Sequence, residues 1–116
     1  MTITIYGIKS CDTMKKACAW LGARHIDYDF HDYKRAGIDR QRLETWERKV
    51  GWEKLLNRAG TTFRKLAEKD KQGLDAGKAI GLMLDHPSMI KRPVLDLGRG
   101  RIVVGFKPEL YEEAFG

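Results

Sequence analysis

The first thirty residues carry two different apolar periods in succession, and this change of period most constrains the fold. Residues 2–6 alternate β-branched and aromatic side chains and end at Gly7, which is typical of a β-strand. A helical stripe of apolar residues follows and predicts a helix that stops at Gly22. Its members are Met14, Ala17, Cys18 and Leu21. Residues 26–30 alternate again, so the segment predicts a βαβ unit with parallel strands and a right-handed crossover.

The middle of the chain, about residues 37–87, is expected to be an all-helical insertion. Its apolar residues recur at helical spacing, in segments that Gly51 and Gly60 separate. No Ser- or Gly-rich linker divides this block from its flanks, so we expect it to pack on the same fold. A chain of 116 residues suits one domain with a core. We therefore expect a single domain whose core comes from residues 1–36 and 88–116.

The C-terminal part of the chain returns to strands. Residues 94–97 and 101–105 predict a hairpin around Gly98-Arg99-Gly100. Pro108 then begins an amphipathic helix that closes the chain. The order β-α-β, helical insertion, β-β-α is that of a thioredoxin-like α/β fold with a mixed sheet.

Composition and charge restrict the class of protein. With 42% hydrophobic residues and no run near the roughly 18 that a membrane span needs, we expect a soluble protein. The N-terminus lacks the features of a signal peptide, which favours a cytoplasmic location. The positive net charge of +6 originates in residues 34–92, where 15 basic side chains outnumber 8 acidic ones, while the flanking residues have 7 basic and 8 acidic side chains. Acidic residues are interspersed there, which favours a solvated face over an anion-attracting one, and no nucleic-acid-binding motif is present.

The thiol of Cys11 is the leading functional candidate. Cys11 lies between the first strand and the helical pattern, among Lys9, Lys15 and Lys16. Unpaired backbone N–H groups, the helix dipole and nearby ammonium groups all favour the thiolate, which is the nucleophile. We therefore predict a reactive cysteine; the alternative is a small buried hydrophobic residue.

The second cysteine, Cys18, is expected to be a core thiol. It lies on the apolar stripe, and the seven residues from Cys11 to Cys18 rise about 10.5 Å along a helix. Disulfide Cα atoms lie only about 4.4–6.8 Å apart, so the two cysteines cannot pair within an intact helix. Two cysteines without a nearby histidine pair give no zinc-binding pattern, and we expect no metal.

Five motifs follow one another along the chain. They are residues 5–17 (Ile-Tyr-Gly-Ile-Lys-Ser-Cys-Asp-Thr-Met-Lys-Lys-Ala), His31-Asp32-Tyr33, Phe63-Arg64-Lys65-Leu66, Ile90-Lys91-Arg92-Pro93-Val94-Leu95 and Val104-Gly105-Phe106-Lys107-Pro108. Together they resemble the ArsC/Spx arsenate-reductase-like family, and most closely its YffB branch. The resemblance covers essentially the whole chain.

The resemblance implies a set of anion-binding residues. In arsenate reductases of this family a loop cysteine attacks arsenate, glutathione and glutaredoxin complete the reduction, and three basic side chains hold the oxyanion. The matching positions here are Cys11, Arg64, Arg92 and Lys107. Guanidinium groups suit an oxyanion or a carboxylate, but position 107 has lysine where arginine is expected. The run Gly7-Ile8-Lys9 also replaces a His-Asn-Pro-type loop, so efficient arsenate reduction is not expected.

The resemblance also bears on how an oxidised Cys11 is resolved. Spx-branch members often carry Cys-x-x-Cys and regulate transcription by binding RNA polymerase, whereas here Met14 occupies the second cysteine position. An external thiol must therefore act, and glutathione is the candidate. In a thioredoxin-like fold the proline matching Pro93 is cis and lies opposite the reactive cysteine, so we predict a cis peptide bond there. The expected substrate- or glutathione-binding residues are Lys15, Arg64, Arg92, Pro93 and Lys107.

The sequence thus favours a cytoplasmic, glutathione-dependent monothiol oxidoreductase with Cys11 as nucleophile. Glutathione is the expected co-substrate, with no bound cofactor. The expected partners are a small thiol, disulfide or oxyanion substrate and, as a candidate, glutaredoxin; neither a membrane nor nucleic acid is expected. The alternative is an Spx-like regulatory or adaptor module that binds RNA polymerase or another protein.

Overall fold

The computed structural model describes residues 3–9 and 11–115. The chain divides into two compact units. Residues 1–36 and 92–116 form one, called here the sheet unit, and residues 37–91 form the other, called the helical unit. The sheet unit contains Cys11 and is described first.

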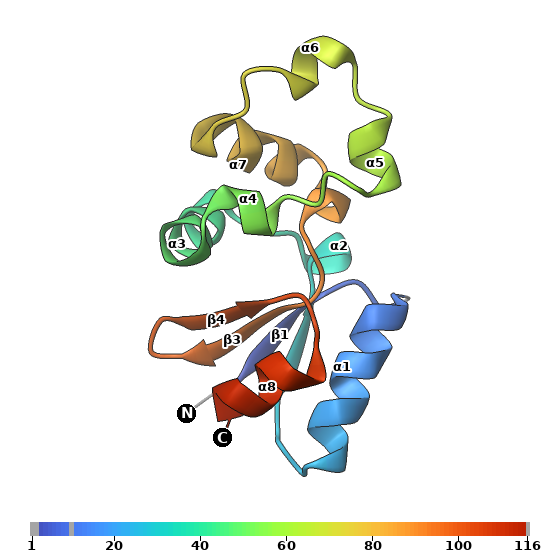
Figure 1. The fold of residues 1–116 in the computed structure, drawn as a ribbon, viewed down its shortest axis with the longest axis vertical. Helices are drawn as coiled ribbons and strands as arrows, with labels where there is room; N and C mark the ends of the chain where they lie inside the picture. Colours follow the sequence, from blue (N-terminus) through green and yellow to red (C-terminus); the bar gives the residue numbers. More distant parts are fainter. Residues whose placement is uncertain (1–2, 10, 116) are drawn as a thin grey trace. The chain divides into compact units, whose positions relative to one another are not determined.

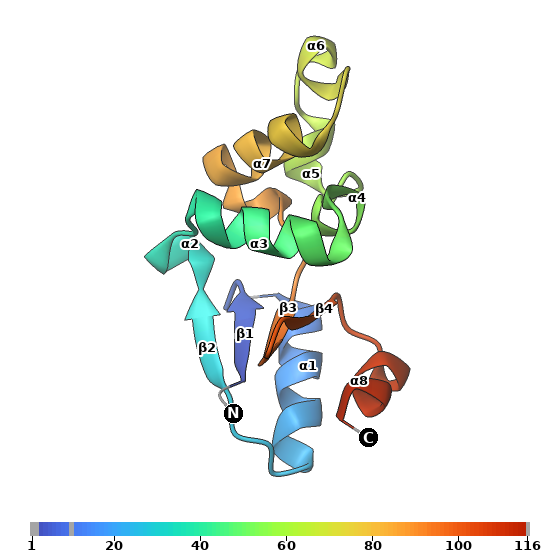
Figure 2. The same cartoon turned by 90° about the vertical axis from the view of Figure 1, so that its left-hand side faces the viewer.

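The sheet unit is built on a four-stranded mixed sheet in the order β2-β1-β3-β4 (Figure 1 and Figure 2). The strands are β1 (Thr4–Gly7), β2 (Asp29–Asp32), β3 (Val94–Gly98) and β4 (Arg101–Val104). β1 and β2 are parallel, whereas β1–β3 and β3–β4 are antiparallel. This topology confirms the thioredoxin-like fold class, including the C-terminal hairpin. Gly98, Arg99 and Gly100 all have positive φ in that turn, which explains its two glycines.

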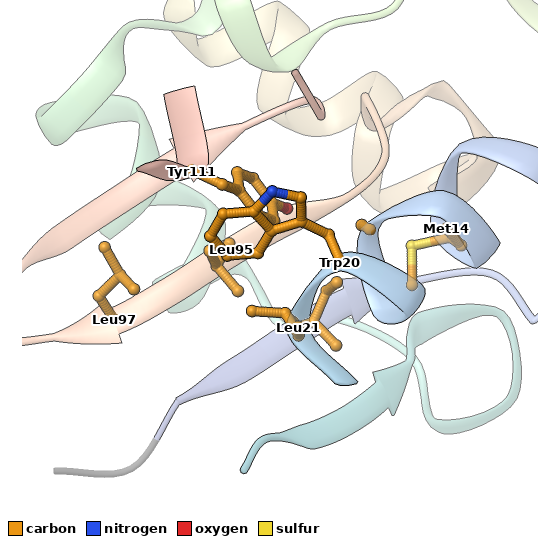
Figure 3. Packing of buried hydrophobic residues seen from close by; sticks show 8 residues of the cluster. Met14, Trp20, Leu21, Leu95, Leu97 and Tyr111 are labelled. Atoms are coloured by element: carbon orange, nitrogen blue, oxygen red, sulfur yellow. The ribbon is translucent and has the colours of Figure 1, made fainter. Parts of the chain in front are cut away.

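Two helices of the sheet unit pack on one face of the sheet. They are α1 (Asp12–Ala23) and α8 (Pro108–Phe115). Ile5 and Leu95 are paired across β1 and β3, so their side chains share that face, and both belong to the buried cluster. The helices contribute most of the cluster, in which the Trp20 and Tyr111 rings meet edge to face at 5.4 Å (Figure 3). This packing fixes α1 against β1.

The second strand begins later than the sequence predicts. The predicted strand covers residues 26–30, but β2 starts at Asp29. The N–H of Ile26 donates to the Leu21 carbonyl at 3.0 Å, so this part of the segment closes the end of α1 instead of joining the sheet. Ile26 and Tyr28 still pack against the core. The alternation at Ile26 and Tyr28 therefore marks contacts with the core, not the start of the hydrogen-bonded ladder, and Phe30, the third apolar residue of the pattern, is exposed.

The boundaries of the first strand and the first helix are close to the predicted ones. The strand ends at Gly7, as predicted, and the helix ends at Ala23, one residue past the predicted stop at Gly22. The predicted start of the strand, Thr2, lies outside the described residues. A short helix that the sequence did not predict, α2 (Tyr33–Ala36), follows β2 directly.

The helical unit consists of short helices (Figure 1). They are α3 (Arg40–Val50), α4 (Trp52–Leu55), α5 (Thr61–Arg64), α6 (Glu68–Lys71), α7 (Ala76–Asp85) and the 3₁₀ helix η1 (Pro87–Met89). The Asp39 carboxylate accepts the Arg42 N–H at 2.7 Å and caps α3, and Asp75 caps α7 in the same way. Gly51 ends α3 with a φ of 88°, as its position in the apolar pattern indicates.

The boundary between the two units falls at residue 92, not at residue 88 as expected. Ile90 forms an isolated antiparallel bridge with Leu56, and the Lys91 N–H donates to the Leu55 carbonyl at 2.7 Å. These backbone bonds tie the segment after η1 to the helical unit. Hydropathy marks where strand β3 begins, but it does not reveal this bridge.

None of the helices in the described ranges, residues 3–9 and 11–115, is long and apolar enough to cross a membrane.

Candidate active site

Cys11 is placed by the end of β1 and the start of α1. Its N–H donates to the Ile8 carbonyl at 3.4 Å across the turn, and its own carbonyl accepts the Lys15 N–H at 3.1 Å. Cys11 is therefore the N-cap residue of α1, with an extended backbone, as the strand-turn-helix pattern predicts. Gly7 supports this turn, because a Cβ built there would overlap the thioether of Met14 in the first turn of the helix.

The environment of Cys11 favours its thiolate. Burial raises the pKa of the partly buried thiol, but four contributions of opposite sign outweigh it. They are the backbone N–H groups of Met14 and Thr13, a hydrogen bond from the Arg92 side chain, and the charge of Arg92. The net result is a Cys11 pKa below the ordinary cysteine value. The thiol makes no capping hydrogen bond of normal geometry, so these N–H groups act mainly as aligned dipoles.

Arg92 supplies the cationic contribution. It lies two residues before the start of β3, and its peptide bond to Pro93 is cis, as predicted. The guanidinium hydrogen-bonds to both the Cys11 sulfur and the Tyr33 hydroxyl oxygen. Burial lowers the pKa of Arg92, but these two partners raise it above its ordinary value, so the group is charged when it faces the thiol.

Tyr33 is the member of this group that the sequence reasoning missed. It is fully buried and is the first residue of α2. Burial raises the pKa of its phenol, the Arg92 guanidinium lowers it, and the Cys11 and Asp32 charges raise it again. The net pKa is far above the ordinary tyrosine value, so the hydroxyl keeps its proton. The only sequence signal was its place in the His31-Asp32-Tyr33 motif, which does not reveal a contact with residue 92.

The three residues meet because three neighbouring strands end or begin at one edge of the sheet. Gly7 is paired with Asp32, and Tyr6 with Val94. Cys11 follows the end of β1 and Tyr33 follows the end of the parallel strand β2. Since β3 runs antiparallel to β1, its start lies at the same edge of the sheet, and Arg92 comes just before that start. The site is therefore a product of sheet order and direction.

The other predicted binding residues are divided between the two units. Lys15 is exposed on α1, four residues after Cys11, and Lys107 is exposed just before α8; both belong to the sheet unit. Arg64 is exposed at the end of α5 and belongs to the helical unit. Roles in binding for Lys15, Arg64 and Lys107 stay predictions.

Cys18 has a different environment from Cys11. It is a free, partly buried thiol packed against the core cluster. The Tyr28 hydroxyl donates a hydrogen bond to it, which raises the pKa of Tyr28. Cys18 therefore contacts a neutral phenol, whereas Cys11 contacts a cation. Over the part of the chain that the structure describes, no group of three or more His, Cys, Asp or Glu side chains is arranged to hold a metal ion.

Comparison with known proteins gives one family. The model of the ArsC family matches residues 6–114. The solved structure of a YffB protein is 61% identical, with a TM-score of 0.95, and the match covers 99% of this chain and all of that one. An uncharacterized protein of Haemophilus influenzae is 42% identical over 97% of this chain and 98% of its own length. The global transcriptional regulator Spx of Streptococcus pyogenes is 26% identical over 92% of this chain and 80% of the regulator.

Proposed function

The chain belongs to the ArsC family, and from that premise we propose that it is a glutathione-dependent monothiol reductase with Cys11 as its nucleophile. The observation that carries the proposal is the pairing of the Cys11 sulfur with the Arg92 guanidinium at the start of α1. This arrangement lowers the pKa of the Cys11 thiol and so favours the thiolate, which is the form that attacks a disulfide.

The proposed reaction has two exchange steps. The Cys11 thiolate attacks the glutathione sulfur of a mixed disulfide, forms a Cys11–glutathione disulfide and releases the substrate as a thiolate. A second glutathione thiolate then attacks the glutathione sulfur of that disulfide and releases Cys11 as its thiolate. The substrate disulfide is reduced, and two glutathione molecules leave as glutathione disulfide. Arg92 and the N–H groups of Thr13 and Met14 stabilise Cys11 as the leaving group in the second step.

An external thiol is needed because the described residues offer no resolving cysteine near Cys11. Met14, which occupies the position of the second cysteine in a Cys-x-x-Cys pair, is buried against Gly7. Cys18 is a free thiol seven residues away on the same helix. The reducing cytoplasm is the compartment that supplies glutathione, and glutaredoxin is a candidate second reductant.

Glutathione carries two carboxylates, which the protein has to recognise with cationic groups. We assign this recognition to Lys15, Arg92 and Lys107, next to Pro93, all of which belong to the sheet unit that holds Cys11. Arg64 is the further cation that the family resemblance implies.

The test is a turnover assay on the mixed disulfide of glutathione with β-mercaptoethanol, in which glutathione reductase and NADPH report glutathione disulfide. Wild-type protein is expected to turn over, and Cys11→Ser to fall to the uncatalysed rate because its hydroxyl is not ionised. Cys18→Ser is the matched control on the same helix and should keep wild-type turnover. Activity retained by Cys11→Ser would place the nucleophile elsewhere, and an inactive wild-type protein would reject the proposed reaction.

Arsenate is the comparison substrate in the same assay. Lysine at position 107 offers a point charge where a guanidinium fork would bind an oxyanion in two places. We therefore expect arsenate to be reduced far more slowly than the mixed disulfide. Equal rates would make the protein an arsenate reductase.

The second candidate function is that of a regulatory adaptor, and the similarity to Spx favours it. It ranks lower because Met14 in place of a second cysteine removes an intramolecular disulfide switch. Titrating purified bacterial RNA polymerase with this protein, oxidised and reduced, separates the two functions. We expect no saturable binding in either state; redox-dependent binding would favour the adaptor.

A further inference from the structure

The Arg92 guanidinium has two hydrogen-bond partners, and only one of them is a reacting atom. One is the Cys11 sulfur, and the other is the Tyr33 hydroxyl oxygen. An arginine side chain is long and loses much rotamer freedom when it is fixed in one place. A cation that stabilises a thiolate acts best when its position is set before the substrate arrives, because it then needs no reorganisation during the reaction. A second, rigid partner for the guanidinium supplies that constraint.

Tyr33 has the properties that such a partner needs. Its side chain is fully buried, and it begins α2 directly after β2. α2 contacts both β1 and β2, so the backbone of Tyr33 is held beside the strand that leads to Cys11. Its hydroxyl accepts from Arg92. The charged groups that face this hydroxyl are Arg92, Cys11 and Asp32, and the Asp32 carboxylate accepts the Lys34 N–H at 3.0 Å.

We propose that Tyr33 is a positioning residue that holds the Arg92 guanidinium against the Cys11 sulfur by accepting a hydrogen bond from it. Tyr33 acts on the sulfur through Arg92 and takes no part in bond formation. The role rests on the proposed function of Cys11 as the nucleophile, and it adds a residue to the site that neither spacing nor charge identified.

The test is the pH dependence of Cys11 alkylation by iodoacetamide, measured in a Cys18→Ser background so that Cys11 is the single thiol. Tyr33→Phe leaves the ring and removes the acceptor, so the guanidinium is released. We expect the midpoint to rise by about half a pH unit, which is about a threefold loss of thiolate at a pH below the midpoint. An unchanged or lower midpoint would overturn the proposal.

Tyr111→Phe is the matched control. Tyr111 is also fully buried, but its hydroxyl has no hydrogen-bond partner among the described residues, and it packs in the core cluster instead. Removing the Tyr111 hydroxyl tests the effect of losing a buried hydroxyl that is not an acceptor for Arg92. We expect the alkylation midpoint to stay at the wild-type value. An equal rise in both variants would show a general effect of core disruption and reject the specific role.

A double-mutant cycle tests whether Tyr33 acts through Arg92. In an Arg92→Ala background there is no guanidinium to hold, so Tyr33→Phe is expected to cause no further rise in the midpoint. Additive rises in the two variants would contradict the proposed route. If Tyr33→Phe does not fold, the wild-type protein still decides by NMR. Alkylation of Cys11 should then shift the Arg92 Nε–H and Tyr33 ring signals but not the Tyr111 ring signals, and an unmoved Tyr33 signal would reject the coupling.

These measurements separate the two proposals. Alkylation reports the ionisation of Cys11 whether or not glutathione is a substrate. A shifted midpoint together with absent glutathione turnover would keep Tyr33 as a positioning residue and reject the reductase. Glutathione turnover together with an unshifted midpoint would support the reductase and reject Tyr33 as a positioning residue.

Discussion

Cys11 and Cys18 lie at the start and in the middle of one helix, both as free and partly buried thiols, yet their surroundings give them different chemistry. At the N-terminal end of α1, Cys11 faces the N–H groups of the first turn and the Arg92 guanidinium. Farther along the helix, Cys18 packs against the core and accepts a hydrogen bond from the Tyr28 phenol. The difference comes from the helix end and from what the sheet brings to it, because the residue type and partial burial are shared.

The comparison shows what a reactive thiol requires. Partial burial alone raises a thiol pKa, and at Cys11 burial is the largest single contribution. It is overcome because several smaller contributions, from the first turn of α1 and from Arg92, act together. A cysteine in the middle of a helix has no unpaired N–H groups ahead of it, and so lacks one of these sources.

The largest expected effect comes from moving a second thiol within reach of the first. Residues three apart rise about 4.5 Å along a helix, inside the roughly 4.4–6.8 Å that separates the Cα atoms of a disulfide. We expect Met14→Cys to form a disulfide between Cys11 and the introduced thiol after mild oxidation, because position 14 is close where position 18 is not. Mass spectrometry after alkylation of the remaining thiols measures the pairing. Wild-type protein, treated identically, is the control; a Cys11–Cys18 disulfide in either protein would contradict the helical geometry.

A smaller effect is expected from removing the cation at Cys11. Arg92→Ala, in a Cys18→Ser background, should raise the midpoint of Cys11 alkylation by about one pH unit. Because a more basic thiolate is also a better nucleophile, the rate below the wild-type midpoint should fall only about threefold. Arg92→Lys keeps the charge and is expected to recover part of the shift. If the midpoint does not move in Arg92→Ala, the helix N-terminus alone distinguishes Cys11 from Cys18.

The smallest effect concerns the partner of Cys18. The Tyr28 pKa is raised first by its hydrogen bond to Cys18, then by burial. Cys18→Ala removes that acceptor, so the phenol should ionise at a lower pH than in the wild-type protein. Ultraviolet titration of tyrosinate measures the change, with Tyr28→Phe identifying which transition belongs to this residue. An unchanged titration would mean that the phenol does not depend on the thiol, and the contrast between the two cysteines would then rest on Cys11 alone.

Particular residues show how far the sequence could predict this molecule. Cys11 at a helix start followed from a change of apolar period, and the end of α3 at Gly51 followed from the glycine that separates two helical segments. The start of β2 did not, because Ile26 and Tyr28 are packed against the core without belonging to the ladder. The bridge between Leu56 and Ile90 was equally absent from the pattern.

The candidate site was likewise predicted only in part from the sequence. The cis peptide bond at Arg92–Pro93 was predicted from a family resemblance and is present. Tyr33 was overlooked because its importance depends on a partner 59 residues away in the sequence, a separation that periodicity does not register. An aromatic residue at a strand end is ordinarily a core residue, and burial alone would not have distinguished it.

By itself, the sequence determined the order of the strands, the position of Cys11 at the start of α1 and the separation of Cys11 from Cys18, because local periodicity and helical rise are properties of neighbouring residues. Only the tertiary structure decided which side chains meet that thiol. Parallel β1 and β2 end where antiparallel β3 begins, so Cys11, Tyr33 and Arg92 converge on one edge of the sheet, and pairing between distant segments is set by the fold as a whole.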